Sequence, residues 1–178
     1  MVRVDETEAI ITRALELGVN FIDTANTYAH GTNEEYIGEA LRRLAVPRGR
    51  RPRLEGLLQR GTSVEGAIER EIEGTLTRLG VDYLNLYIIH RFDYSTPMAE
   101  TMEALDRLVR DGRARALGAS AMYGYQLHNL QRVADENGWT RLSSLQNHYN
   151  LLYREDEREL IPVVRQYGMS LTPYSPLA

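Results

Sequence analysis

The sequence predicts an α/β protein built around a parallel sheet, and two observations carry that prediction. Helical and strand patterns alternate along the 178 residues, which is typical of βαβ units. The segment 81–90, VDYLNLYIIH, is apolar almost throughout, as expected for a strand that is buried on both faces of a parallel sheet. The pattern alone fits either a doubly wound sheet or a barrel.

The first half of the chain contains three of the predicted helices and two of the predicted strands. The helix over 5–17 begins with acidic and Thr capping candidates, carries apolar residues at helical spacing and stops at Gly18. A short apolar strand, VNFIDTA, follows over 19–25, and a second helix covers 33–44. A third helix, 64–79, ends at Gly80 and leads into the strand 81–90.

The second half repeats the alternation without interruption. A helix over 97–111 ends at Gly112. The remaining helices are predicted at 124–136 and 155–167, and the remaining strands at 113–120, 142–147 and 169–175.

Composition narrows the partners and the location that we expect. The net charge is -4, from 21 basic and 25 acidic residues, so the chain is no polycation suited to nucleic acid or an anionic membrane. The absence of cysteine excludes disulfides and thiolate chemistry, and we expect no metal site. No segment is apolar enough to span a bilayer, and the N-terminus lacks a signal-peptide pattern, so we expect a cytoplasmic protein.

Polar side chains of mixed chemistry close each predicted strand, and this favours a barrel over a doubly wound sheet. A (β/α)-barrel places its active site at the carboxyl ends of its strands. No glycine-rich nucleotide-binding motif competes with that interpretation. The polar strand ends are Asp23, His90, Ser120, Gln146 with Asn147, and Tyr174 with Ser175.

Several segments, in order, resemble those of the aldo-keto reductase family. They are FIDTANTYAHGTNEEYIGEALR, LYIIHRFD, LGASAMY, QNHYNLLYREDE and PYSPLA. The resemblance covers nearly all of the chain except residues 47–63. It implies that residues 1–178 form a single partial domain. It implies a (β/α)8 barrel of the TIM type that is incomplete, with the first and eighth strands absent and the third disrupted.

The resemblance also implies an enzyme that reduces an aldehyde or ketone to an alcohol with NADP(H). Tyr28 would protonate the carbonyl oxygen, His90 would orient the carbonyl, and Asp23 would pair with a lysine that lowers the pKa of the tyrosine. A neighbouring cation has that effect because it stabilises the phenolate, and a phenol with a pKa of about 10 is otherwise a poor acid at neutral pH.

The cofactor residues are likewise implied by the resemblance. Ser120, Gln146 and Asn147 would hold the nicotinamide carboxamide, and Tyr174 would stack on the ring. Ser175 and Leu177 would begin the loop over the pyrophosphate. The partner expected is a small carbonyl compound, and the sequence indicates neither its identity nor an oligomeric state.

The segment 47–63 departs from the family pattern. It is rich in arginine and shows no strand pattern, and the whole chain contains no lysine, although the family requires one after its third strand. We hypothesise a compensated frameshift between about Arg48 and Val64, because the Glu55 and Gly56 codons read one base later yield only Lys or Arg. A Glu55 carboxylate near the site would raise the pKa of Tyr28 rather than lower it, so we expect negligible carbonyl reduction.

Three alternatives remain. In the first, the chain is a non-catalytic subunit that binds nicotinamide or a partner protein. In the second, it is a fragment that does not fold stably. Alternatively, the arginines of 47–63 bind nucleic acid, which is disfavoured because no aromatic residues are interleaved and the chain is acidic.

Overall fold

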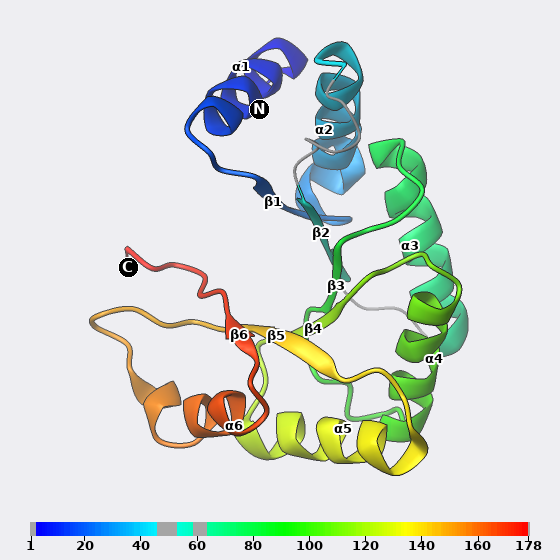
Figure 1. Ribbon diagram of the computed structural model, residues 1–178, viewed down its shortest axis with the longest axis vertical. Coiled ribbons are helices and arrows are strands. Elements are labelled where there is room, and N and C mark those ends of the chain that lie inside the picture. The colour runs from blue at the N-terminus through cyan, green and yellow to red at the C-terminus, as the bar shows by residue number, and fades with distance from the viewer. Residues whose placement is uncertain (1–2, 46–52, 59–63, 178) are drawn as a thin grey trace.

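In the described part of the chain, six parallel strands pair in chain order, and helices cover one side of the sheet that they form (Figure 1). The computed structural model describes residues 3–45, 53–58 and 64–177. The strands are β1 Phe21–Ala25, β2 Arg53–Leu58, β3 Leu86–Ile89, β4 Leu117–Ser120, β5 Leu142–Gln146 and β6 Ser170–Leu171. The helices are α1 Val4–Glu16, α2 Thr32–Arg43, α3 Val64–Leu79, α4 Met98–Arg110, α5 Gly124–Asn137 and α6 Leu160–Gln166, with short 3-10 turns η1 Tyr28–Gly31 and η3 Glu155–Glu157.

The predicted alternation of helices and strands is confirmed, but the strands are shorter than expected. The predicted strands 81–90 and 113–120 make an isolated bridge at Leu84 and Ala114 before their continuous pairing begins. The helix predicted over 155–167 is divided into η3 and α6.

The third strand of the expected barrel is present as β2, which corrects the expectation that it would be disrupted. β2 pairs in parallel with β1 on one side and β3 on the other. Ladder hydrogen bonds join backbone groups, so two flanking strands can hold a third whose side chains lack the usual alternation. The rest of 47–63, at 47–52 and 59–63, lies outside the described residues.

Side chains alternate between the two faces of the sheet and build two apolar layers. The larger layer packs between the sheet and the helices, with Tyr87 and Ile89 of β3 and Leu117 of β4 among its members. A smaller cluster on the opposite face contains Ala25, Leu86 and Ile88. This alternation is the period of two expected for strands.

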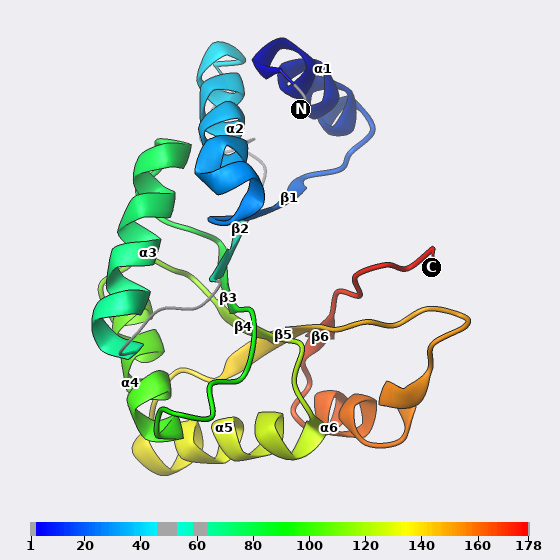
Figure 2. The same ribbon diagram turned by 180° about the vertical axis from the view of Figure 1, so that it is seen from behind.

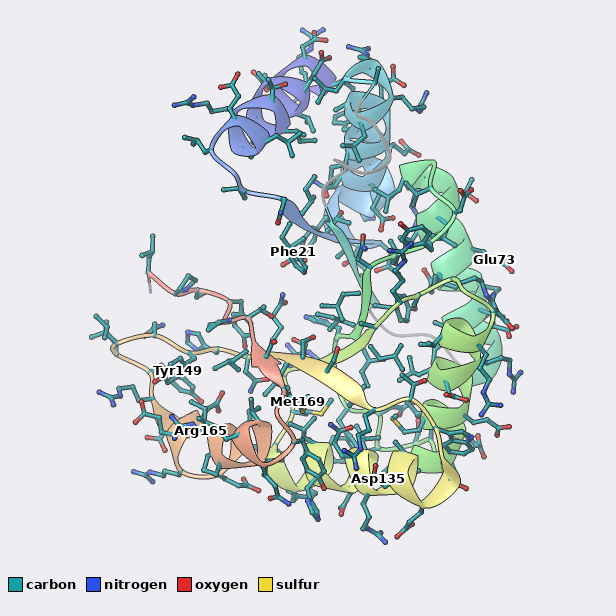
Figure 3. The ribbon with its side chains drawn as sticks, viewed as in Figure 1. Phe21, Glu73, Asp135, Tyr149, Arg165 and Met169 are labelled. Atoms are coloured by element: carbon teal, nitrogen blue, oxygen red, sulfur yellow. The ribbon has the colours of Figure 1, made fainter. Side chains whose placement is uncertain are left out.

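The sheet is curved into an arc with the helices on its outside (Figures 1 and 2). Phe21, at the start of β1, lies towards the interior of the arc, whereas Glu73 lies on the outer side of α3 (Figure 3). β1 and β6 form the two ends of the sheet, and no described strand pairs with their outer edges. The arc is therefore the six-stranded part of a barrel-like wall.

Helix α2 is joined to α3 by a buried ion pair. The Glu34 carboxylate is fully buried and accepts hydrogen bonds from Arg78 Nε at 2.6 Å and from Thr75 Oγ1 at 3.0 Å. Gly38 brings the two helices together, since a Cβ there would lie 2.5 Å from the Arg78 carbonyl oxygen.

No helix in the described part of the chain has the length and apolarity needed to cross a membrane.

Candidate active site

Asp23 and Gln146 meet inside the arc although 123 residues separate them in the sequence. Gln146 Nε2 donates a hydrogen bond to Asp23 Oδ2 at 3.1 Å. Asp23 is on β1 and Gln146 is the last residue of β5, with three strands between them in the sheet. The bond is possible because curvature brings side chains of non-adjacent strands together across the interior face.

The Asp23 carboxylate keeps part of its surface open to solvent, yet surrounding protein atoms remove enough water to raise its pKa. The hydrogen bond from Gln146 opposes that shift, because it stabilises the ionised form.

His90 follows β3 directly and is half-buried. Desolvation lowers its pKa, and the nearby positive charge of Arg91 lowers it further. The imidazole is therefore held towards its neutral form. Its Nδ1 atom is buried without a hydrogen-bond partner among the described residues.

Ser120 and Asn147 add two more unsatisfied polar atoms at neighbouring strand ends. Ser120 closes β4 opposite Gln146 in the strand register, and its Oγ has no partner in the described structure. Asn147 donates to Asp156 Oδ2 at 3.1 Å, while its own Oδ1 is buried and lacks a described partner. Buried polar atoms are usually paired, so this concentration is typical of a site that receives a polar ligand.

Asp156, on η3, has a raised pKa. Burial is the main cause, and the hydrogen bond from Asn147 opposes it.

The three C-terminal cofactor candidates lie beyond β6. Tyr174 donates its backbone N–H to the Asn147 carbonyl at 3.0 Å, and its ring is stacked on His148 with centroids 5.3 Å apart. Ser175 has a φ of 51°, in the left-handed region. Leu177 is exposed and lies near the end of the described chain.

Tyr28 begins η1 and is exposed. The backbone after it is strained, because Ala29 and His30 have φ values of 49° and 55°. Two hydrogen bonds hold the start of this loop: Thr24 Oγ1 to Asn33 Oδ1 at 2.6 Å, and Asn26 Nδ2 to a carboxylate oxygen of α3 at 2.7 Å.

Glu55 occupies the position at which the frameshift hypothesis places a lysine. The strand register sets its backbone beside Asp23 on β1 and Leu86 on β3. The side chain of Glu55 lies outside the described part of the structure, so the expectation that it affects Tyr28 stays a prediction.

Of the predicted residues, the structure joins Asp23 to Gln146 by a side-chain bond and Asn147 to Tyr174 through the backbone. It sets Ser120 beside Gln146 in the strand register. Tyr28 and Leu177 lie at exposed positions instead.

Sequence reasoning missed Asn150 and Asp156. A signal for Asn150 existed in QNHYNLLY, since an Asn that caps the backbone two and three residues later is typical of a turn.

The described residues contain no group of three or more His, Asp or Glu side chains able to hold an ion.

The sequence profile of the Aldo/keto reductase family matches residues 2–178. An aldo-keto reductase of Fusarium vanettenii is 37% identical over 198 residues, which covers 95% of this chain and 54% of that protein. The versiconal hemiacetal acetate reductase of Aspergillus parasiticus is 35% identical over 198 residues, covering 98% of this chain and 57% of that protein.

The fold also agrees with the crystal structure of a putative 2,5-diketo-D-gluconic acid reductase B. The TM-score is 0.83 at 28% identity, over 98% of this chain and 58% of that one. The chain thus spans a little over half the length of the proteins that it matches. Because the family profile matches residues 2–178 and the chain is 37% identical to the Fusarium vanettenii protein over 95% of its own length, it belongs to the aldo/keto reductase family.

Proposed function

We propose that the polar strand ends form a site for NADP(H)-dependent reduction of an aldehyde or ketone to an alcohol, and that this chain carries the reaction out poorly or not at all. The observation that supports the site is the meeting of Asp23 and Gln146, with polar atoms of His90, Ser120 and Asn147 at the neighbouring strand ends that have no partner among the described residues.

The buried polar atoms at the strand ends fit the carboxamide of a nicotinamide. A carboxamide has both N–H donors and a carbonyl acceptor, and Ser120 Oγ and Asn147 Oδ1 are buried groups that need such partners. Tyr174 would offer its exposed aromatic surface to the ring. When bound, the reduced cofactor supplies a hydride to the carbonyl carbon.

The protein's own part in this reaction is to orient the carbonyl and deliver a proton. His90, held towards its neutral form, would donate a hydrogen bond to the carbonyl oxygen from one ring nitrogen. Tyr28 would give its phenolic proton to the oxygen as the hydride arrives at the carbon. A phenol needs a nearby cation to do this readily at neutral pH, and the chain has no lysine to provide it.

A second candidate is a non-catalytic subunit that binds nicotinamide or a partner protein. The observation that favours it is the placement of Glu55 beside Asp23 in the register, where the family reaction needs a cation. Binding of the cofactor would then survive without turnover.

The test compares the wild-type chain with Glu55→Lys, which restores a cation beside Asp23, and with Glu55→Gln, which only removes the negative charge. NADPH binding is followed by nicotinamide fluorescence, and NADPH oxidation is followed with 4-nitrobenzaldehyde as substrate. We expect all three chains to bind NADPH and Glu55→Lys alone to gain aldehyde-dependent oxidation.

Three other outcomes would each decide against part of this proposal or for the second candidate. Aldehyde-dependent oxidation by the wild type at the rate of Glu55→Lys would contradict the impairment. Binding by all three chains with turnover by none would favour the non-catalytic subunit. Failure of all three to bind NADPH would contradict the nicotinamide site.

A further inference from the structure

A single buried side chain, Asn150, joins the loop after β5 to the C-terminal tail. Its Oδ1 atom accepts hydrogen bonds from the backbone N–H groups of Leu152 at 2.9 Å and Tyr153 at 2.8 Å. Its Nδ2 atom donates to the Ser175 carbonyl at 3.0 Å and lies 3.2 Å from His148 Nε2. The side chain is 8% exposed, so water does not compete for these bonds.

These partners fix the orientation of the Asn150 amide and, through it, the tautomer of His148. Two N–H groups on one side require the amide oxygen there, and the Ser175 carbonyl on the other side requires the amide nitrogen. The nitrogen of an amide only donates, so His148 Nε2 accepts and the ring proton is on Nδ1.

His148 lies between two tyrosine rings. Its centroid is 4.5 Å from that of Tyr153 with the planes 19° apart, and 5.3 Å from that of Tyr174 with the planes 7° apart. The ring that Asn150 orients is therefore the ring against which Tyr174 rests.

Asn150 also holds the backbone just after Tyr174. Ser175 has a left-handed φ of 51°, which a non-glycine residue keeps only when its surroundings hold it. The hydrogen bond from Asn150 to the Ser175 carbonyl is a direct restraint of that kind. One side chain thus restrains Tyr174 at its ring, through His148, and at its backbone, through Ser175.

We propose that Asn150 is a positioning residue that fixes the plane of the Tyr174 ring, so that its exposed surface receives a nicotinamide ring in a preset orientation. The inference rests on the proposed function for its ligand. A ring that is already immobile loses little freedom when a planar ligand stacks on it, so preorganisation tightens binding without adding a contact.

The test variant is Asn150→Asp. It keeps the shape and the acceptor for Leu152 and Tyr153, but it replaces both donors with an oxygen that repels the Ser175 carbonyl. The matched control is Asn137→Asp at the exposed end of α5, where the amide also donates to a carbonyl, that of Val133, at 2.9 Å. Measurements are made at about pH 8, above the range in which imidazoles ordinarily titrate.

Two readouts separate positioning from general stability. Proton NMR of the His148 ring reports the ring currents of the tyrosines that flank it, and nicotinamide fluorescence gives the Kd for NADPH and for reduced nicotinamide mononucleotide. In Asn150→Asp we expect the His148 resonances to move towards those of an unstacked imidazole. We also expect both ligands to bind about tenfold more weakly, or about 1.4 kcal/mol. In Asn137→Asp neither should change.

Unchanged His148 resonances in Asn150→Asp would overturn the inference, whatever happens to the Kd. Shifted His148 resonances with an unchanged Kd would overturn it as well, because the orientation of the Tyr174 ring would then have no effect on nicotinamide binding. A wild-type chain that binds neither ligand, but whose His148 resonances still respond to Asn150→Asp, would overturn the proposed function and leave a purely structural role. If Asn150→Asp loses its cooperative thermal transition, His148→Ala replaces it, with the same loss of affinity expected.

Discussion

At the scale of single residues, charge and burial conflict at Asp23. The carboxyl pKa is raised by desolvation, so the folded chain holds this proton more tightly than the unfolded chain does. Between the ordinary and the raised pKa, the native state therefore binds more protons. Stability falls as pH rises through that interval, and the ionised carboxylate destabilises the fold at neutral pH.

Asp23→Asn should remove that cost, since an Asn oxygen can still accept the hydrogen bond from Gln146. We expect the free energy of unfolding at pH 7 to increase by about a few tenths of a kcal/mol, a small gain because the carboxylate is partly exposed and screened by water. Urea denaturation of both chains at pH 7 and at about pH 3 measures it. The gain should vanish at the lower pH, where Asp23 is protonated in both states, and an equal gain at both pH values would contradict the explanation.

At the scale of the elements, the ion pair between α2 and α3 differs from the surface ion pairs of the chain. Glu34 is fully buried and Arg78 is mostly so, with 26% of its side chain exposed. The exposed pair of Arg132 and Glu136 on α5 has 56% and 54% of its side chains exposed. Exposed pairs contribute little to stability, whereas removing one member of a buried pair leaves the other charge without compensation.

Glu34→Ala should therefore lower the free energy of unfolding by about 3 kcal/mol, since Arg78 and Thr75 would both lose a buried partner. Glu136→Ala is the control and should change it by about 0.5 kcal/mol or less. Urea denaturation measures both variants. Similar losses in the two would mean that burial does not distinguish these pairs.

At the scale of the whole molecule, the outer edge of β1 has no strand partner among the described residues. Apolar side chains lie exposed close to this edge, with Val19 at 53% and Phe21 at 38%. An unpaired edge with apolar side chains is a template for pairing with another chain.

The 178-residue chain expressed by itself should therefore associate as its concentration rises. Phe21→Lys, which puts a charge on the edge strand, should reduce this association, because lysine opposes edge-to-edge pairing. Ile10→Lys is the control: Ile10 is even more exposed, at 61%, but it lies on α1 away from the edge. Light scattering over a concentration series measures both, and an equal effect of the two variants would exclude the edge as the cause.

The sequence alone determined the order of the elements other than β2, the family and the polar residues at the strand ends. These follow from local information, because apolar periodicity, glycine stops and motifs are each contained within one continuous stretch of the chain. The helix over 64–79 was predicted with its observed bounds for this reason. The catalytic and cofactor roles of Tyr28, His90 and Tyr174 stay predictions, since they were carried over from the family resemblance.

Only the tertiary structure decided what depends on neighbours distant in the sequence. β2 forms because β1 and β3 supply backbone partners on both sides, although its own side chains predict no strand. Asp23 accepts its hydrogen bond from Gln146 because the sheet is curved, and Asn150 reaches Ser175 because the C-terminal tail returns beside the loop after β5. Curvature and backbone pairing are properties of the assembled sheet, and no local pattern in the sequence encodes them.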